Sequence, residues 1–496
     1  MFRYDVCVIG GGILGCMVAR ELMKYRVKAV LAEKREDVCT GMTRANTAVV
    51  YAGYDHKPGT LKGKLCAEAN QDFERMCREL EVPMKRCGSL MVCFGARGEQ
   101  VLERKLADGR RNGVPGLAML DGAAVLEMEP NLSPQVRKGL YAPTTGTVNP
   151  WELGIAAFEN ARDNGCEMRL GAEAVAIRRQ GDGFEIELLE NNTVSQVIWA
   201  KGIMNCAGLH ADTVREMVFP PKIRIFTQRA DYLVFDDQLQ GFLNHVIFYE
   251  PEEKGKGLTL VPAVDGNILA GASKQGGEDR ECFKTTPEGL AFLSKMCREA
   301  VPGLPMDQVI RNFGSIRPNP FEVEPDGRGG YQKKDRRIRS FVIEQERECP
   351  SMISLIGVKT PGLTCSGKLA EYTVRKLLDA IGMADWKNEA FCPKRRGIPK
   401  IAQMSFEQRR KQAKQNPDYG KIVCCCRKVT EGEIREAIRR GAVTVDGIKR
   451  RCGAGMGRCQ GGRCEQRVVE LLAEELSISP GQVKKDGPES FVFRSI

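Results

Sequence analysis

Four cysteines near the C-terminus have the spacing of ligands for a metal centre. They form two close pairs, Cys424-x-Cys426 and Cys459-x-x-x-x-Cys464, separated by thirty-two residues. Four thiolates brought together in this way can hold either a tetrahedral metal ion or a 2Fe–2S cluster. The spacing therefore predicts a metal centre and leaves a structural zinc ion open as the alternative to a cluster.

A second pattern with chemical meaning lies at the N-terminus, where Gly10, Gly12 and Gly15 have dinucleotide-binding spacing. The first glycine allows a tight turn, the second lets the backbone approach a pyrophosphate, and the third allows a helix to pack closely on a strand. The N–H groups at the start of that helix can then bind the phosphates. Glu33 follows Gly10 by 23 residues, where a carboxylate can accept hydrogen bonds from ribose hydroxyls. These residues alone do not distinguish FAD from NAD.

Each pattern needs particular elements to position it. Around the glycines, apolar residues predict a strand over 4–9, a helix over 13–23 and a second strand over 27–32, which together form a βαβ unit. Further strands are predicted at 184–188, 232–235 and 268–270. We expect these later strands to form the antiparallel sheet of a substrate domain inserted into the nucleotide domain.

The C-terminal cysteines are also framed by predictable elements. Thr430 and Glu433 have the spacing of a capping box, which predicts a helix from there to Gly441. The glycine-rich stretch 453–457 predicts a tight turn whose N–H groups can point at sulfur, and a helix is expected over 465–476. Residues 386–420 are polar and basic, contain three prolines and are interpreted as a linker that wraps or tethers.

The composition limits the function classes. The chain has 496 residues, which favours more than one domain. Its net charge of +11 is scattered, apart from short runs such as 394–396 and 449–451. A nucleic-acid-binding protein usually concentrates its charge on one face, so no nucleic-acid partner is expected. The charge instead favours anionic substrates, an acidic partner or, at most, peripheral contact with a membrane surface.

The cellular compartment is interpreted from the cysteines and the N-terminus. Twenty cysteines in a chain of this length, together with the metal-site spacing, favour a reducing cytoplasm over a disulfide framework. Asp5 interrupts the first apolar run, so we do not expect an export signal. No stretch reaches the roughly 18 apolar residues that a membrane span needs.

Several segments carry a resemblance to a known family. They are 43–48 (TRANTA), 52–54 (AGY), 57–62 (KPGTLK), 205–212 (NCAGLHAD) and 357–364 (GVKTPGLT). Through them, residues 1 to about 385 resemble the D-amino-acid-oxidase-like superfamily of FAD oxidoreductases. Within it, the chain looks most like anaerobic glycerol-3-phosphate dehydrogenases and L-2-hydroxyglutarate dehydrogenases or oxidases.

The resemblance implies which residues bind the cofactor, FAD. In relatives, the Ala-Gly stretch lies against the dinucleotide, and the Pro-Gly-Leu-Thr turn brings a backbone N–H and a helix start to the flavin edge. The cofactor-binding residues expected here are Gly10, Gly12, Ile13, Leu14, Gly15, Glu33, Thr43, Asn46, Ala207, Gly208, Gly357, Pro361, Gly362, Leu363 and Thr364.

The resemblance also implies a substrate site. Arg317 matches an arginine that binds the anionic group of the substrate, and a guanidinium suits bidentate capture of a carboxylate or phosphate. Arg229 and Lys274 are expected to line the same pocket. Tyr51 replaces a histidine that many relatives have near the flavin, and tyrosine is a poor base near neutral pH. His56 and His245 are therefore the other candidate bases.

The C-terminal segment resembles the small 2Fe–2S domain of the bacterioferritin-associated-ferredoxin type. That resemblance makes Cys424, Cys426, Cys459 and Cys464 the ligands and leaves Cys425 and Cys452 as bystanders. The expected fold is α/β: a Rossmann-like FAD-binding domain with an inserted antiparallel-sheet substrate domain, plus a small helical iron–sulfur domain. The expected bounds are 1–385 (FAD-binding parts 1–85, 145–215 and 310–385; substrate parts 86–144 and 216–309), linker 386–420, cluster domain 421–478 and tail 479–496.

These expectations combine into a functional hypothesis. The chain is an FAD-dependent dehydrogenase that oxidises a small anionic alcohol, with sn-glycerol 3-phosphate as the first choice and dihydroxyacetone phosphate as the product. Electrons leave singly through the 2Fe–2S cluster to a redox partner protein or a quinone-linked acceptor. The alternatives are L-2-hydroxyglutarate or another 2-hydroxy acid, an amine or imino acid, a non-catalytic electron-transfer subunit, and a zinc-binding regulator without flavin.

Overall fold

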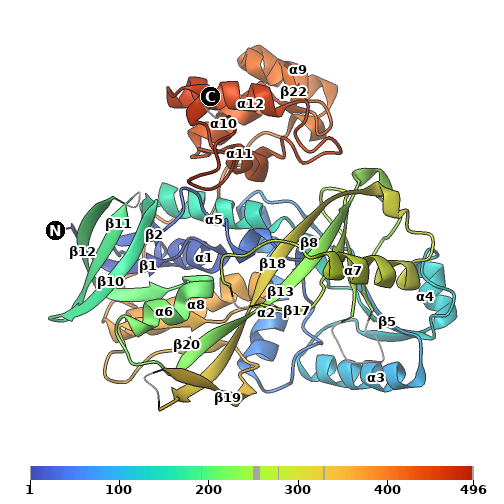
Figure 1. The fold of residues 1–496 in the computed structure, drawn as a ribbon, viewed down its shortest axis with the longest axis horizontal. Coiled ribbons are helices and arrows are strands. Elements are labelled where there is room, and N and C mark those ends of the chain that lie inside the picture. Colours follow the sequence, from blue (N-terminus) through green and yellow to red (C-terminus); the bar gives the residue numbers. More distant parts are fainter. Residues whose placement is uncertain (1, 191–192, 250–256, 278, 328–329, 494–496) are drawn as a thin grey trace.

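Two large sheets and a small C-terminal domain make up the chain (Figure 1). The computed structural model describes residues 2–190, 193–249, 257–277, 279–327 and 330–493. The small domain, drawn in orange and red, lies above the helix α5 (Pro150–Asp163), and its helix α11 (Val445–Cys452) packs against α5. No helix in this described part of the chain combines the length and the apolar character that a membrane crossing requires.

The first sheet has a parallel centre. Its five parallel strands run in the order β9 (Glu167–Leu170), β2 (Ala29–Glu33), β1 (Phe2–Ile9), β12 (Val194–Asn205) and β21 (Met352–Ile356). The antiparallel strands β10 (Ala172–Gln180), β11 (Gly183–Glu190) and β20 (Val342–Glu344) extend it. Residues 6–8 are fully buried, as expected for a parallel strand covered on both faces.

Helices cover this sheet and complete the βαβ opening that the sequence predicts. Helix α1 (Ile13–Leu22) connects β1 to β2 and packs against α5 and α8 (Gly362–Ala380). Helix α2 (Leu61–Glu79) packs against α8, and the short α6 (Ala211–Glu216) follows β12. The predicted strand at 184–188 lies in β11, where Phe184, Ile186 and Leu188 are buried in alternation.

The second sheet is almost entirely antiparallel. Its long strands β13 (Ile223–Phe235) and β18 (Val309–Pro325) pair with each other and run through the middle of the molecule (Figure 1). The order is β19 (Tyr331–Arg337), β18, β13, β16 (Ile268–Gly271), β15 (Thr259–Pro262), β14 (Val246–Tyr249), β5 (Ser89–Cys93), β7 (Lys138–Ala142) and β6 (Ala118–Asp121), with β17 (Gln275–Gly276) beside β13. Only the pair of β14 and β5 is parallel among these described strands.

Helices α3 (Ala96–Arg111), α4 (Gly122–Met128) and α7 (Pro287–Ala300) pack on the second sheet. A small sheet of β3 (Val49–Val50), β8 (Gly146–Val148) and β4 (Met84–Lys85) accompanies the two large ones. The predicted strands at 232–235 and 268–270 lie in β13 and β16, so the predicted antiparallel sheet is present.

The C-terminal domain, residues 422–493, has its own core. It contains β22 (Ile422–Cys424), β23 (Val429–Thr430), α10 (Glu431–Arg439), α11 and α12 (Glu465–Leu476). The side chains of Ile434, Leu471 and Leu472 are fully buried. Thr430 and Glu433 form the predicted capping box, and α12 has the predicted bounds.

The segment interpreted as a linker is ordered and attached to the first sheet's helices. Arg395 forms an ion pair with Glu159 on α5 at 2.7 Å, and both side chains are buried. The side chain of Asn160 donates to the carbonyl of Cys392 at 3.0 Å. Helix α9 (Phe406–Gln415), which the polar composition did not predict, follows with a capping box of its own. The segment therefore ties the C-terminal domain to α5.

Candidate functional site

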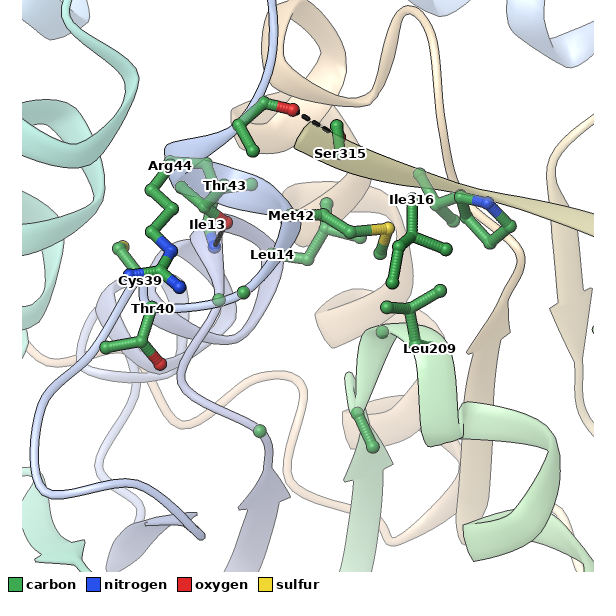
Figure 2. A pocket seen from close by; sticks show the side chains of 18 of the residues that line it. Ile13, Leu14, Cys39, Thr40, Met42, Thr43, Arg44, Leu209, Ser315 and Ile316 are labelled. Carbon is green, nitrogen blue, oxygen red and sulfur yellow. Dashed lines mark hydrogen bonds between the residues drawn. The ribbon is translucent and has the colours of Figure 1, made fainter. Parts of the chain in front are cut away.

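A cavity of about 580 Å³ opens between the first sheet and the long strands β13 and β18. Met42, Leu209 and Ile316 come from three separate segments and point toward one another along it (Figure 2). Most of the predicted site residues line this cavity: Gly10, Gly12, Ile13, Leu14, Glu33, Thr43, Asn46, Tyr51, Ala207, Gly208, Arg317, Pro361, Gly362 and Leu363. The cavity therefore brings predicted cofactor-binding residues together with two predicted substrate-site residues, Tyr51 and Arg317.

The glycine turn fits a dinucleotide. Gly10 has a φ of +104°, and a Cβ there would lie 2.6 Å from the carbonyl oxygen of Cys206. A Cβ at Gly15 would overlap the carbonyl oxygen of Gly10, so this glycine lets α1 pack directly on the turn, although it does not line the cavity. Gly12, Ile13 and Leu14, at the start of α1, line the cavity, and this is where a pyrophosphate would bind.

The carboxylate of Glu33 lies at the end of β2 and lines the cavity. It accepts hydrogen bonds from the N–H groups of Gly11 at 2.5 Å and Arg35 at 2.9 Å. Burial raises the pKa of this carboxyl, against the effect of those two donors. Glu33 thus lies in the cavity wall, and its contact with ribose hydroxyls stays a prediction.

The loop after β2 folds over the start of α1. The short helical turn Met42–Arg44 places the hydroxyl of Thr43 to accept from the N–H of Ile13 at 3.0 Å. The Asn46 side chain donates to the Thr43 carbonyl at 2.8 Å and holds the loop. Ser315 on β18 donates to the carbonyl of Ala45 at 2.5 Å (dashed line, Figure 2). The loop thereby links the nucleotide end of the cavity to the second sheet.

Two predicted cofactor residues support the cavity without lining it. Thr364, in the first turn of α8, accepts a hydrogen bond from the N–H of Tyr51 at 3.0 Å and is buried. Gly357 has a φ of +64°, and a Cβ there would lie 2.7 Å from Pro320. Both residues fix neighbouring backbone rather than touching the contents of the cavity.

Arg317 and Tyr51 lie at the substrate end of the cavity. The side chain of Arg317 forms no hydrogen bond or ion pair with any other residue that the structure describes, so its charge is available to an anion. Burial raises the pKa of Tyr51 to about 12, although a hydrogen bond with Thr47 and the charge of Arg317 lower it. Tyr51 therefore stays protonated at neutral pH and acts as a donor rather than as a base.

The two histidines predicted as bases lie outside the cavity. Nδ1 of His245 is 2.8 Å from the buried carboxylate of Glu129, which also accepts from the His245 backbone N–H. His56 precedes α2, and its carbonyl accepts from the Asn112 side chain at 2.7 Å. These contacts are structural and leave neither imidazole at the substrate end.

Two predicted substrate-binding residues, Arg229 and Lys274, also lie outside the cavity lining. Arg229 is paired with Ile316 across the two long strands, but its side chain lies against Gly277 and does not line the cavity. Lys274 is exposed and does not line the cavity. Lys359, which the sequence interpretation left unassigned, does line it and bonds to the Asn319 side chain. It lies within the matched segment 357–364, so the signal for it was present.

The four predicted cluster ligands come together as two pairs. The Sγ atoms of Cys426 and Cys459 are 3.5 Å apart, and Cys424 is hydrogen-bonded to Cys464. That bond and the N–H groups of Gly455, Arg427 and Cys426 lower the pKa of Cys424 to about 5, against the effect of burial.

This arrangement suits two irons better than one zinc ion. Among the described residues, no three His, Cys, Asp or Glu side chains are arranged to hold a metal ion together. The two pairs of thiols match a 2Fe–2S cluster, in which each iron takes two thiolates. Cys452 instead donates to the Ile448 carbonyl, and burial raises its pKa to about 12, so it remains a bystander.

The fold, the glycine turn and the paired thiols define a flavoprotein oxidoreductase with an added iron–sulfur domain. The chain belongs to the family described as "FAD dependent oxidoreductase", which matches residues 5–376, and residues 422–474 match the "BFD-like [2Fe-2S] binding domain". It is thus an FAD-dependent dehydrogenase whose cofactors are FAD and a 2Fe–2S cluster, as predicted.

Three similar proteins extend the comparison. A protein of Caloramator mitchellensis named "Glycerol 3-phosphate dehydrogenase" is 40% identical over 99% of this chain and 98% of its own length. The FAD-bound L-alpha-glycerophosphate oxidase of Mycoplasma pneumoniae has a TM-score of 0.70 at 26% identity, covering 80% of this chain and 99% of that one. The glycerol-3-phosphate dehydrogenase of Bacillus halodurans has the same fold, with a TM-score of 0.66 at 18% identity over 96% and 91% of the two chains.

The role of Glu33 gives a first testable prediction. The substitution Glu33→Gln should weaken FAD binding by about tenfold, since one charged hydrogen bond contributes about 1.5 kcal/mol. Titration of the apoprotein, followed by quenching of flavin fluorescence, measures this affinity. Glu68→Gln, at an exposed position on α2 away from the cavity, is the control and should bind FAD normally. Equal affinities in the two variants would remove Glu33 from the cofactor site.

Proposed function

We propose that the protein oxidises sn-glycerol 3-phosphate to dihydroxyacetone phosphate and passes the electrons through its 2Fe–2S cluster to an external acceptor. The observation that carries the proposal is the guanidinium of Arg317, which has no partner among the residues that the structure describes, in a cavity that Lys359 also lines. The similarity to the Caloramator mitchellensis protein, across nearly all of both chains, supports the choice of substrate.

The charges at the substrate end suit a phosphate monoester, which carries close to two negative charges at neutral pH. Arg317 can bind two phosphate oxygens in a planar fork, and Lys359 adds a compact charge on the same cavity. A 2-hydroxy acid is the second candidate, because a carboxylate also fits the guanidinium fork. An amine substrate gains nothing from two cations.

The chain's own residues would orient the substrate for oxidation. Bound FAD would supply the acceptor for the hydride of the carbinol carbon while the hydroxyl proton passes to water, and a bound cluster would supply a one-electron carrier. Arg317 and Lys359 hold the phosphate, while Tyr51, protonated at neutral pH, offers a hydrogen bond to the reacting hydroxyl. The apolar side chains of Met42, Leu209 and Ile316 limit the water in the same cavity.

We propose that electrons leave the protein through the C-terminal domain. Cys426 is exposed, as is Cys425 beside it, so one edge of the thiol set faces solvent. A redox protein or a quinone-linked acceptor can approach that edge directly. We therefore propose an acceptor other than oxygen.

Anaerobic mixing with a substrate panel tests the proposal. We expect sn-glycerol 3-phosphate to bleach the visible flavin absorbance. Its second-order rate constant should be at least about 100-fold above those of L-2-hydroxyglutarate, other 2-hydroxy acids and amino acids. That ratio corresponds to about 2.7 kcal/mol of transition-state discrimination. Faster bleaching by L-2-hydroxyglutarate or an amine would assign that substrate instead. No bleaching by any compound, with both cofactors bound, would favour an electron-transfer subunit.

A further inference from the structure

The end of the chain contributes to the same cavity as its beginning. Asp486, Gly487 and Pro488 line the cavity together with Gly10 and Gly12. We propose that this tail segment, residues 483–492, is part of the FAD site, so that docking of the C-terminal domain and binding of FAD stabilise each other. The inference goes beyond the proposed function, because it holds whichever substrate the enzyme oxidises.

The tail segment is built on the C-terminal domain. The carbonyl of Lys484 accepts from the N–H of Val445, and that of Lys485 accepts from Asp446, at 3.1 and 2.8 Å. The N–H of Val492 donates to the carbonyl of Val483 at 3.0 Å, which closes the segment on itself. Val483 is 1% exposed in the core of that domain. The segment is therefore a fixed extension of the domain rather than a loose end.

The tip of the tail segment is paired with the loop between β2 and β3, residues 34–48, which we call the cofactor loop. Asp486 accepts a hydrogen bond from Arg450 on α11 at 2.9 Å and forms an ion pair with Arg44. Arg44 lines the cavity and extends beside Cys39 and Thr40 (Figure 2). Asp486 thus connects a cavity-lining cation of the first domain to a helix of the C-terminal domain.

A second, buried contact joins the same two parts. Asp37, in the loop after Glu33, accepts from Arg451 at 2.7 and 2.8 Å and from Arg450 at 3.1 Å. All three side chains are at most 5% exposed, and Asp37 also lines the cavity. Charges buried to this extent are tolerated only when they are paired, so this contact requires the docked arrangement.

The cofactor loop therefore depends on the C-terminal domain for its charge balance. Three of its cavity-lining residues, Glu36, Asp37 and Arg44, are paired with Lys484, the arginines of α11 and Asp486, respectively. An FAD molecule that orders this loop favours docking, and by thermodynamic reciprocity docking favours FAD.

The test measures release of FAD from the full-length holoprotein carrying Asp486→Asn. We expect the rate constant for FAD release, followed by the rise of flavin fluorescence after dilution, to increase about tenfold, within the usual range of coupling between sites. Cluster absorbance should stay unchanged. In wild-type protein, FAD should also slow hydrogen exchange of α11 and of the tail segment.

The matched control is Glu475→Gln, because Glu475 also pairs with two arginines, Arg435 and Arg439, but lies within the C-terminal domain and away from the cavity. Release of FAD at the wild-type rate from Asp486→Asn, or equal acceleration by Glu475→Gln, would overturn the proposal. If Asp486→Asn does not fold, Pro488→Gly replaces it. This variant removes a cavity-lining ring without touching an ion pair, and unchanged release from it would likewise overturn the proposal.

Discussion

Replacing Arg317 with methionine is expected to lower kcat/KM for sn-glycerol 3-phosphate by about 1,000-fold. The guanidinium has no partner among the described residues, so its loss removes a contact with the substrate and leaves the protein's own pairing intact. Truncating one side of a buried charged pair costs about 2–5 kcal/mol, and 1,000-fold corresponds to about 4 kcal/mol. Arg317→Lys should recover part of the loss, since it keeps the charge without the planar fork.

Steady-state rates of dye reduction measure this effect, and flavin content shows whether the site is intact. The control is Arg229→Met on the paired strand β13, since Arg229 lies against Gly277 and does not line the cavity. We expect its kcat/KM to stay within about threefold of wild type, in line with its absence from the site. Activity within fivefold of wild type in Arg317→Met, or an equal loss in Arg229→Met, would contradict the assignment.

Removing one predicted cluster ligand should separate the two half-reactions. In Cys426→Ala, substrate should still bleach the flavin at a rate close to wild type, because the cavity is unchanged. Electron delivery to a one-electron protein acceptor should fall by at least about 100-fold, since the cluster requires four thiolates. Iron content and visible absorbance of anaerobically purified protein should show that the cluster is lost.

The neighbouring residue provides a closely matched control. Cys425 is exposed, like Cys426, and precedes it directly, but the paired arrangement of the thiols does not include it. Cys425→Ala should retain iron, the cluster spectrum and electron delivery. A complete cluster in Cys426→Ala would show that the ligand set is wrong, and zinc in place of iron in the wild-type protein would exclude the cluster itself.

Features that depend on neighbouring residues were predictable from the sequence. The strand, turn and helix around Gly10 and Gly15 follow from spacing alone, and so does the capping box at Thr430. The start and end of α12 were also predicted, because apolar periodicity and flanking residues define a helix locally. The family, the fold class and both cofactors followed from such local patterns combined with the resemblance.

Features that depend on distant contacts were not predictable. The run 449–451 stood out in the sequence only as a short cluster of basic residues, yet Arg450 and Arg451 are buried against Asp37, some four hundred residues earlier. His245 was a candidate base because histidines are scarce, but only the fold reveals its bond to Glu129. The motif around Arg229 also does not reveal that its side chain lies against Gly277, on a separate segment of the chain.

The contribution of Gly12 and Asp486 to one cavity has a consequence for biosynthesis. At about 5–20 residues per second, roughly 24–95 seconds separate the translation of Gly12 from that of Asp486. During translation, the glycine turn is therefore synthesised long before the cavity-lining residues 486–488 of the tail segment. Firm retention of the flavin would then require that the tail segment has been translated, and products that terminate before residue 483 would lose the flavin more readily.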